Sequence, residues 1–326
     1  MAEFFVNLKR FEVPRGLGGV CGERDPKKWI QSVMRKTLEF GLGRYEGMSL
    51  TFLLPEALVI PAAEIARGYL PSEKGYLHIG CQSVYRDNVT RGGNFGAFTS
   101  LLPASAAANM GCTWTMIGHS EERKDKLDII AAYDPMVRDE PERMKKTGDA
   151  ISTLLNRAVL RALESDMNVL FCVGETAEER GGGTFDQQKP RIAEILQSQL
   201  EMGLKGIEPF SRTKKIVIAY EPRWAIGPGK TPPGTDYIEF VSGLIKEEVK
   251  RSYGYEPAVV YGGGLKVENA KSIAGIRTID GGLIALTRFT GEIGFEPEGL
   301  RSIIQTYLGE EAVTIGESGC RRKHPE

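Results

Sequence analysis

The sequence predicts an α/β fold in which eight parallel strands close into a single (β/α)₈ barrel. Short apolar runs rich in β-branched residues alternate along the chain with segments of helical spacing, and eight such strand signals can be counted. Parallel strands need long crossover connections, and the helices in those connections then cover the sheet. Eight repeats of this unit favour a closed barrel, with its chemistry at the carboxyl ends of the strands.

An open, doubly wound parallel sheet is the alternative. In that fold a glycine-rich GxGxxG turn after the first strand would bind phosphate at a helix N-terminus. No such motif follows the first apolar run of this chain. Its absence weakens the open-sheet alternative.

The expected elements follow in order along the chain. The strands are expected at residues 4–8, 50–54, 77–81, 113–117, 169–173, 216–220, 258–261 and 282–286. The helices are expected at residues 29–42, 151–162, 190–202, 237–249, 268–274 and 298–308. Residues 237–249 keep apolar side chains on one face over more than three turns, which is the clearest amphipathic signal in the sequence.

Length and composition allow one large domain or two ordinary ones. We expect one barrel over residues 1–310, interrupted by a highly charged, solvated segment at about 124–148, and a mobile C-terminal tail at 311–326. The chain has 42 basic and 43 acidic residues, which suggests neither nucleic acid nor an anionic membrane as a partner. No apolar run is long enough to span a membrane and no secretory signal is evident, so we expect a cytoplasmic protein.

Five scattered cysteines without a CxxC pair predict reduced thiols and no zinc site.

The stretch at residues 219–231, AYEPRWAIGPGKT, gives the first indication of chemistry. Glu221 directly follows a buried strand, Pro222 ends that strand, and the next residues contain further Pro and Gly breakers around one tryptophan. A carboxylate at a strand tip beneath such a loop is typical of a base under a lid. A solvated surface glutamate before an ordinary turn is the alternative.

Polar side chains follow other strands at the same predicted edge. Asn7 and Lys9 follow the first strand and share a face, His119 and Glu121 follow the fourth, and Glu175 follows the fifth. A cation, an imidazole and a carboxylate at one barrel mouth can polarise a carbonyl while a base removes the adjacent proton.

Six motifs together resemble the triosephosphate isomerase family. They are NLK at 7–9, GAFT at 96–99, GHSEER at 118–123, CVGE at 172–175, AYEPRWAIGPGKT at 219–231 and YGGG at 261–264. The resemblance implies interconversion of dihydroxyacetone phosphate and glyceraldehyde 3-phosphate, a step of glycolysis and gluconeogenesis. It implies a small phosphorylated sugar as substrate, no metal or organic cofactor, and a homodimer formed through the loop at 96–99. The charged segment at 124–148 is an insertion relative to the family.

The resemblance also assigns catalytic roles. Glu221 would be the base, and neutral His119 would be the electrophile that hydrogen-bonds the substrate carbonyl. Lys9 would supply positive charge, Asn7 a further donor, and Glu121 would pair with Lys9. Ser120 would be the resting partner of Glu221.

The loop that begins at Pro222 resembles the family's lid. Trp224 would anchor its hinge through a hydrogen bond to Glu175, and Ile226 would close against Leu283. The lid and clamp residues are Pro222, Trp224, Ile226, Lys230 and Leu283. The substrate-binding residues are Gly227, Gly263, Gly264, Ala285 and Leu286.

Several positions depart from the family pattern. Gly264 replaces a serine, and Ala285 and Leu286 replace two glycines of the presumed phosphate site, so two side chains stand where phosphate approaches closely. Leu101 and Glu122 replace an interface ion pair. The departures favour an alternative substrate, such as a tetrulose phosphate. A non-catalytic sugar-phosphate or protein-binding barrel is a third possibility, against which the retained Asn7, Lys9, His119 and Glu221 argue.

Overall fold

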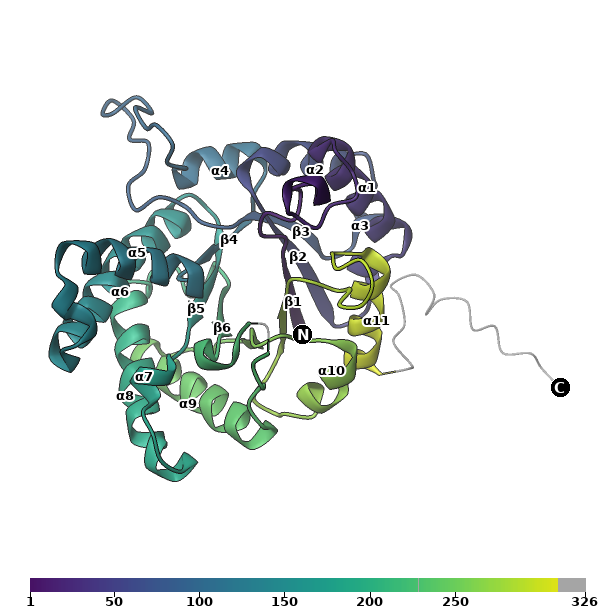
Figure 1. The fold of residues 1–326 in the computed structure, drawn as a ribbon. Helices are drawn as coiled ribbons and strands as arrows, with labels where there is room; N and C mark the ends of the chain where they lie inside the picture. The colour runs from purple at the N-terminus through teal and green to yellow at the C-terminus, as the bar shows by residue number, and fades with distance from the viewer. Residues whose placement is uncertain (228, 310–326) are drawn as a thin grey trace.

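The chain forms a closed eight-stranded parallel barrel, as the sequence predicts (Figure 1). The computed structural model describes residues 1–227 and 229–309, so the predicted tail at 311–326 lies outside the described residues. Each strand pairs in parallel with the next, and β8 closes the sheet on β1. The strands are β1 (Ala2–Asn7), β2 (Met48–Leu54), β3 (Leu77–Cys81), β4 (Trp114–Ile117), β5 (Asn168–Val173), β6 (Ile216–Tyr220), β7 (Val259–Tyr261) and β8 (Gly281–Ile284).

Helices surround the barrel as an outer ring (Figure 1). They are α1 (Pro26–Glu39), α2 (Glu56–Arg67), α3 (Pro71–Lys74), α4 (Ala104–Met110), α5 (Ser120–Tyr133), α6 (Pro141–Glu164), α7 (Ala177–Arg180), α8 (Phe185–Gly203), α9 (Thr235–Tyr253), α10 (Val267–Ala274) and α11 (Pro297–Leu308). Sequence reasoning did not anticipate α2 or α4, because Pro61 lies inside α2 and α4 has only seven residues. Within residues 1–227 and 229–309, no helix is long and apolar enough to cross a membrane.

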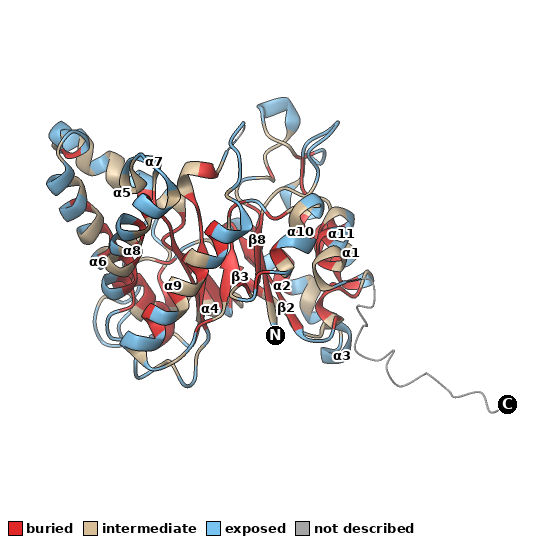
Figure 2. Cartoon of the chain, turned by 90° about the horizontal axis from the view of Figure 1, so that it is seen from below, coloured by how far each residue is buried: buried red, intermediate tan, exposed pale blue. Residues whose placement is uncertain are grey.

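Alternate residues of each strand face two separate apolar layers. On β1, Phe5 packs inside the barrel against Trp114 and Leu283, whereas Phe4 and Val6 face the helices. Both layers are buried, so the strands are mostly red in Figure 2, while the outer faces of the helices are exposed. Burial on both faces explains why the strands read as continuous apolar runs.

The charged segment at 124–148 is helical over most of its length. It comprises most of α5, a 3₁₀ turn (Pro135–Arg138) and the first turns of α6, which begins ten residues before the helix expected at 151. Pairs between charged side chains support it: Arg143 lies 2.7 Å from Asp134 and 2.5 Å from Glu140. Such pairs and the proline at the start of α6 favour helical structure in a segment whose surface is largely solvated.

Strand β8 ends two residues earlier than expected. Its last residue, Ile284, pairs with Val6 near the end of β1, and the chain then leaves the sheet. An excursion held by a bridge between Arg288 and Gly294 follows. Ala285 and Leu286 therefore lie in the loop beyond the strand, at the mouth of the barrel.

Candidate active site

Four of the predicted site residues lie at the carboxyl ends of strands. Asn7 is the last residue of β1, His119 follows β4 and caps α5, Glu175 follows β5, and Glu221 follows β6. All four are at least nine-tenths buried. The closed barrel brings these strand ends to one mouth, and hydrogen bonds connect the ends of β1, β4 and β6 with their neighbours there.

His119 and Glu221 contact one another directly. The Nε2 atom of His119 lies 3.2 Å from Oε1 of Glu221. On the other side of the ring, Nδ1 accepts a hydrogen bond from the backbone N–H of Glu121 at 3.2 Å. Nδ1 therefore acts as an acceptor, which leaves Nε2 as the ring nitrogen that faces Glu221.

Glu221 rests on the start of α5. Its Oε2 accepts a hydrogen bond from the backbone N–H of Ser120 at 2.9 Å, and its Oε1 accepts one from the Ser120 hydroxyl at 3.3 Å. The predicted contact between Ser120 and Glu221 is confirmed. The N-terminus of a helix favours a carboxylate, so the start of α5 is a favourable place for the Glu221 side chain.

Lys9 stands on a backbone held in the left-handed region, with φ of 44°. Three contacts hold it there. Its backbone N–H donates to Asn7 Oδ1 at 3.0 Å, its carbonyl accepts from Gln82 Nε2 at 2.9 Å, and its ammonium pairs with Glu121 at 2.5 Å. The predicted pair between Lys9 and Glu121 is therefore present. Although burial opposes it, the hydrogen bond and charge of Lys9 lower the pKa of Glu121.

Gln82 is a site residue that sequence reasoning missed. Its Nε2 donates to Asn7 Oδ1 at 3.0 Å as well as to the Lys9 carbonyl, so it joins the end of β3 to the end of β1. Because both donors meet on Asn7 Oδ1, the amide NH₂ of Asn7 is the donor left for a ligand. The signal was available, since Gln82 directly follows β3 at the functional end of the barrel.

Arg123 is a second residue that was missed. It is buried, its Nε donates to the Gly118 carbonyl at 2.9 Å, and its Nη2 donates to the Cys172 carbonyl at 3.0 Å. Burial lowers the pKa of Arg123 to about 10. These bonds fasten α5 to the ends of β4 and β5, and so fix the segment that carries His119.

The lid anchor has the predicted contact. Trp224 lies in a 3₁₀ turn (Arg223–Ala225) and donates from Nε1 to Oε1 of Glu175 at 2.8 Å. Burial raises the pKa of Glu175, against the effect of its hydrogen-bond donors. Pro222 is buried, Ile226 is half-buried, and Gly227 and Lys230 are exposed. Residue 228 lies outside the described residues.

The predicted phosphate-site residues lie at the ends of β7 and β8. Gly263 is buried and Gly264 has φ of 96°, a conformation that favours glycine over the serine of the family pattern. Ala285 and Leu286 are half-buried. Leu283 differs from the rest because its side chain packs within the barrel core, so in this structure it is a core residue.

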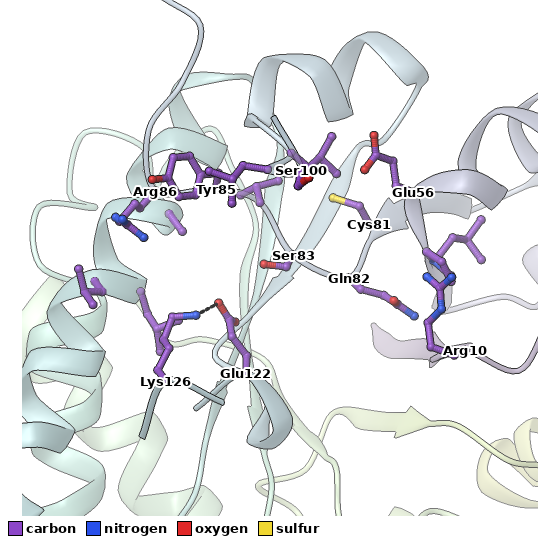
Figure 3. A pocket seen from close by; sticks show the side chains of 18 residues that line it. Arg10, Glu56, Cys81, Gln82, Ser83, Tyr85, Arg86, Ser100, Glu122 and Lys126 are labelled. Carbon is purple, nitrogen blue, oxygen red and sulfur yellow. Dashed lines mark hydrogen bonds and ion pairs between the residues drawn. The ribbon is translucent and has the colours of Figure 1, made fainter. Parts of the chain in front are cut away.

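A cavity of about 370 Å³ lies beside the site (Figure 3). Gln82 lines it from the loop directly after β3. Glu122 and Lys126, whose side chains pair at 2.8 Å, line it from α5. Leu101, from the loop that joins β3 to α4, lines it as well. The two positions where the sequence departs from the family's interface ion pair, Leu101 and Glu122, thus face one cavity.

Residues 1–227 and 229–309 hold no cluster of three His, Cys, Asp or Glu side chains that could bind a metal ion.

Comparison with known proteins agrees with the motifs. The family profile described as triosephosphate isomerase matches residues 73–292. Curated proteins named triosephosphate isomerase are 33% identical over 192 residues in Chloroherpeton thalassium, 36% over 193 residues in Chlorobium phaeobacteroides and 30% over 208 residues in Finegoldia magna. These matches cover 58%, 58% and 63% of this chain. They span 64%, 64% and 69% of the length of the respective relatives.

A solved structure agrees on the fold. The crystal structure of triosephosphate isomerase from Bartonella henselae superposes with a TM-score of 0.64 at 20% identity, covering 94% of this chain and 99% of the other. At that identity the likeness supports the barrel alone. The family profile matches residues 73–292, which is more than half of this chain. The chain therefore belongs to the triosephosphate isomerase family.

Proposed function

We propose that this protein interconverts dihydroxyacetone phosphate and glyceraldehyde 3-phosphate by proton transfer through an enediolate. The observation that carries the proposal is the contact between His119 Nε2 and Glu221 Oε1 at 3.2 Å, with Nδ1 of the same ring occupied by a backbone N–H. This arrangement supplies a base and a neutral donor side by side. Lys9 and Asn7 lie at the same mouth of the barrel.

The proposed reaction begins with a substrate carbon placed between base and donor. Glu221 takes a proton from the carbon beside the carbonyl, and His119 donates from Nε2 to the oxygen that becomes negative. The Lys9 ammonium and the Asn7 amide stabilise the developing oxyanion, a type of contact worth roughly 10² to 10³ in rate per donor. His119 Nε2 then takes up the proton of the adjacent hydroxyl while Glu221 returns its proton to the former carbonyl carbon. The hydroxyl and the carbonyl thereby exchange places without net gain or loss of electrons.

A larger sugar phosphate, such as a tetrulose phosphate, is the second candidate substrate. Ala285 and Leu286 place side chains in the loop after β8, and Gly264 lacks the hydroxyl that the family pattern has there. These changes alter the region expected to hold the phosphate, while the proton-transfer residues are retained. They bear on the choice of substrate and leave the proposed chemistry unchanged.

The test is a direct assay of purified protein with triose phosphates and tetrulose phosphates, using Glu221→Asp and the exposed control Glu142→Asp. Shortening the base withdraws its carboxylate by about 1 Å, so we expect Glu221→Asp to lower kcat by roughly 10²-fold or more. The control variant should match the wild type. Faster turnover of a tetrulose phosphate would favour the second substrate, and no turnover of any sugar phosphate would refute isomerase activity.

We further propose a homodimer formed through the loop at residues 96–99 and a cytoplasmic location. The loop between β3 and α4 projects from the barrel (Figure 1), and Phe95 within it is 87% exposed. The cavity lined by Gln82, Leu101 and Glu122 lies beside the base of this loop and has room for a side chain from a second copy.

A further inference from the structure

Two residues at the ends of the proposed lid, Trp224 at its start and Tyr237 directly after it, donate to the same buried carboxylate oxygen of Glu175. Trp224, at the start of the lid, donates from Nε1 to Oε1 of Glu175 at 2.8 Å. Tyr237, near the start of α9 and directly after the lid, donates from its hydroxyl to the same oxygen at 2.7 Å. The two rings also pack edge to face, with centroids 5.5 Å apart.

Glu175 has more donors than one of its oxygens needs. Tyr220 on β6 also donates to Oε1, at 3.0 Å, so three donors share this atom. The other oxygen, Oε2, is buried and has no hydrogen-bond partner among the described residues. A carboxylate oxygen offers about two lone-pair directions, so Oε1 stays satisfied after one of its three donors leaves.

The three donors differ in their freedom to move. Tyr220 is fixed in the barrel sheet. Tyr237 is held in a helix, is 8% exposed, and stacks on Phe185 of α8 with centroids 4.7 Å apart. Trp224 lies in the short 3₁₀ turn at the start of the proposed lid and is only partly buried. Of the three, Trp224 is the donor that leaves when the loop moves.

We propose that Tyr237 is a positioning residue for the lid, whose hydroxyl keeps Glu175 hydrogen-bonded when Trp224 withdraws. This hydrogen bond reduces the free energy needed to close the lid. A buried carboxylate that loses a donor is destabilised unless other donors remain. Without this hydroxyl, Glu175 would keep only the Tyr220 donor once Trp224 withdrew. The open position, in which Trp224 still donates, would then be favoured over the closed one. The inference rests on the proposed function, since it requires a substrate over which the lid closes.

The test is Tyr237→Phe, which removes one hydroxyl and keeps the ring contacts with Trp224 and Phe185. Isothermal titration calorimetry would measure the affinity for 2-phosphoglycolate, an analogue of the proposed enediolate over which we expect the lid to close, and for inorganic phosphate, which carries only the phosphate. We expect the affinity for 2-phosphoglycolate to fall about tenfold and that for inorganic phosphate to stay unchanged. The KM for the triose phosphate should rise by a similar factor, with a much smaller change in kcat.

Tyr253→Phe is the matched control, because Tyr253 lies on the same helix and its hydroxyl donates to the Glu201 carbonyl at 3.2 Å, away from the lid. It should bind both ligands like the wild type. Equal 2-phosphoglycolate affinities for Tyr237→Phe and wild type, or equal weakening toward both ligands, would overturn the inference. A wild type that neither binds nor converts sugar phosphates would remove the proposed function and this inference together. An active wild type with an indifferent Tyr237→Phe variant would contradict only the inference.

Discussion

At the scale of single residues, the site depends on backbone groups as much as on side chains. One backbone N–H donates to Nδ1 of His119 and so orients the ring, and another donates to Oε2 of Glu221 and holds its carboxylate in place. Lys9 reaches the mouth from a left-handed backbone, which for a residue with a side chain costs on the order of 1 kcal/mol or more. Contacts from its neighbours must therefore hold Lys9 in this conformation.

Substitution of Gln82 should test whether neighbouring side chains hold Lys9 in its left-handed conformation. Gln82→Met removes the donor to the Lys9 carbonyl and to Asn7 Oδ1 while keeping a side chain of similar length. A misplaced Lys9 stabilises the developing oxyanion less well, so we expect kcat/KM for the preferred sugar phosphate to fall by about 10- to 100-fold. Steady-state kinetics would measure the change.

Gln305→Met serves as the control for that substitution, because Gln305 donates to the Tyr45 hydroxyl at 3.0 Å from α11. Its kinetics should match the wild type. Unchanged kcat/KM in Gln82→Met would show that Lys9 keeps its position without Gln82, and would contradict the role assigned to these two hydrogen bonds.

At the scale of elements, hydrogen bonds to the ends of β4 and β5 hold the start of α5, and with it His119 and Ser120, in place at the site. His119 caps this helix and Ser120 begins it, so any shift of α5 moves the partners of Glu221. Arg123, one turn further on, bonds to the carbonyls of Gly118 and Cys172 and to the Ser152 hydroxyl of α6. One buried cation thus joins α5, α6 and two strand ends.

Arg123→Met should destabilise the protein, because it leaves those carbonyls buried without donors. Each lost partner costs about 1–3 kcal/mol, so we expect the free energy of unfolding to fall by roughly 2–4 kcal/mol. Urea denaturation would measure it.

Arg157→Met is the matched control: Arg157 pairs with Asp87 at 2.7 Å on the surface, where such pairs contribute about 0–1 kcal/mol. Equal losses in the two variants would show that burial of Arg123 has no special weight.

At the scale of the whole molecule, the loop between β3 and α4 projects from the barrel (Figure 1). Its base is fixed by Asn88, which accepts from Ser105 and donates to Ser165 at 2.8 Å, and by the edge-to-face contact of Tyr85 with Phe98. A fixed loop that carries an exposed hydrophobic side chain is suited to insertion into a second copy.

Phe95→Asp should weaken the proposed dimer. It places a charge at this exposed position, and Asp tolerates the left-handed φ of 53° found there. Light scattering coupled to size exclusion should show a dimeric wild type and a variant shifted toward the monomer.

Tyr133→Asp, at a position 93% exposed on α5, is the control for added charge and should remain dimeric. A monomeric wild type, or a dimer that persists in Phe95→Asp, would count against docking through this loop.

The sequence predicted the barrel and the main site residues for one physical reason. Parallel strands buried on both faces leave long apolar runs, and the rule that chemistry lies at their carboxyl ends directs attention to Asn7, His119 and Glu221. Boundaries were less secure where local signals conflict. The proline at position 61 argued against a helix, so α2 was not predicted. Ala285 and Leu286 are apolar, so the predicted β8 ran two residues past its last pairing with β1.

Local patterns in the sequence therefore determined the fold class, the order of the strands and the candidate catalytic side chains, because apolar spacing and turn residues act over a few positions. The tertiary structure alone decided that Gln82 holds Lys9, that Arg123 holds the start of α5, and that Trp224 and Tyr237 meet on one oxygen of Glu175. Each of these depends on which side chains the closed barrel brings within hydrogen-bond distance. Such distances are set by packing among elements far apart in the chain, which no local pattern records.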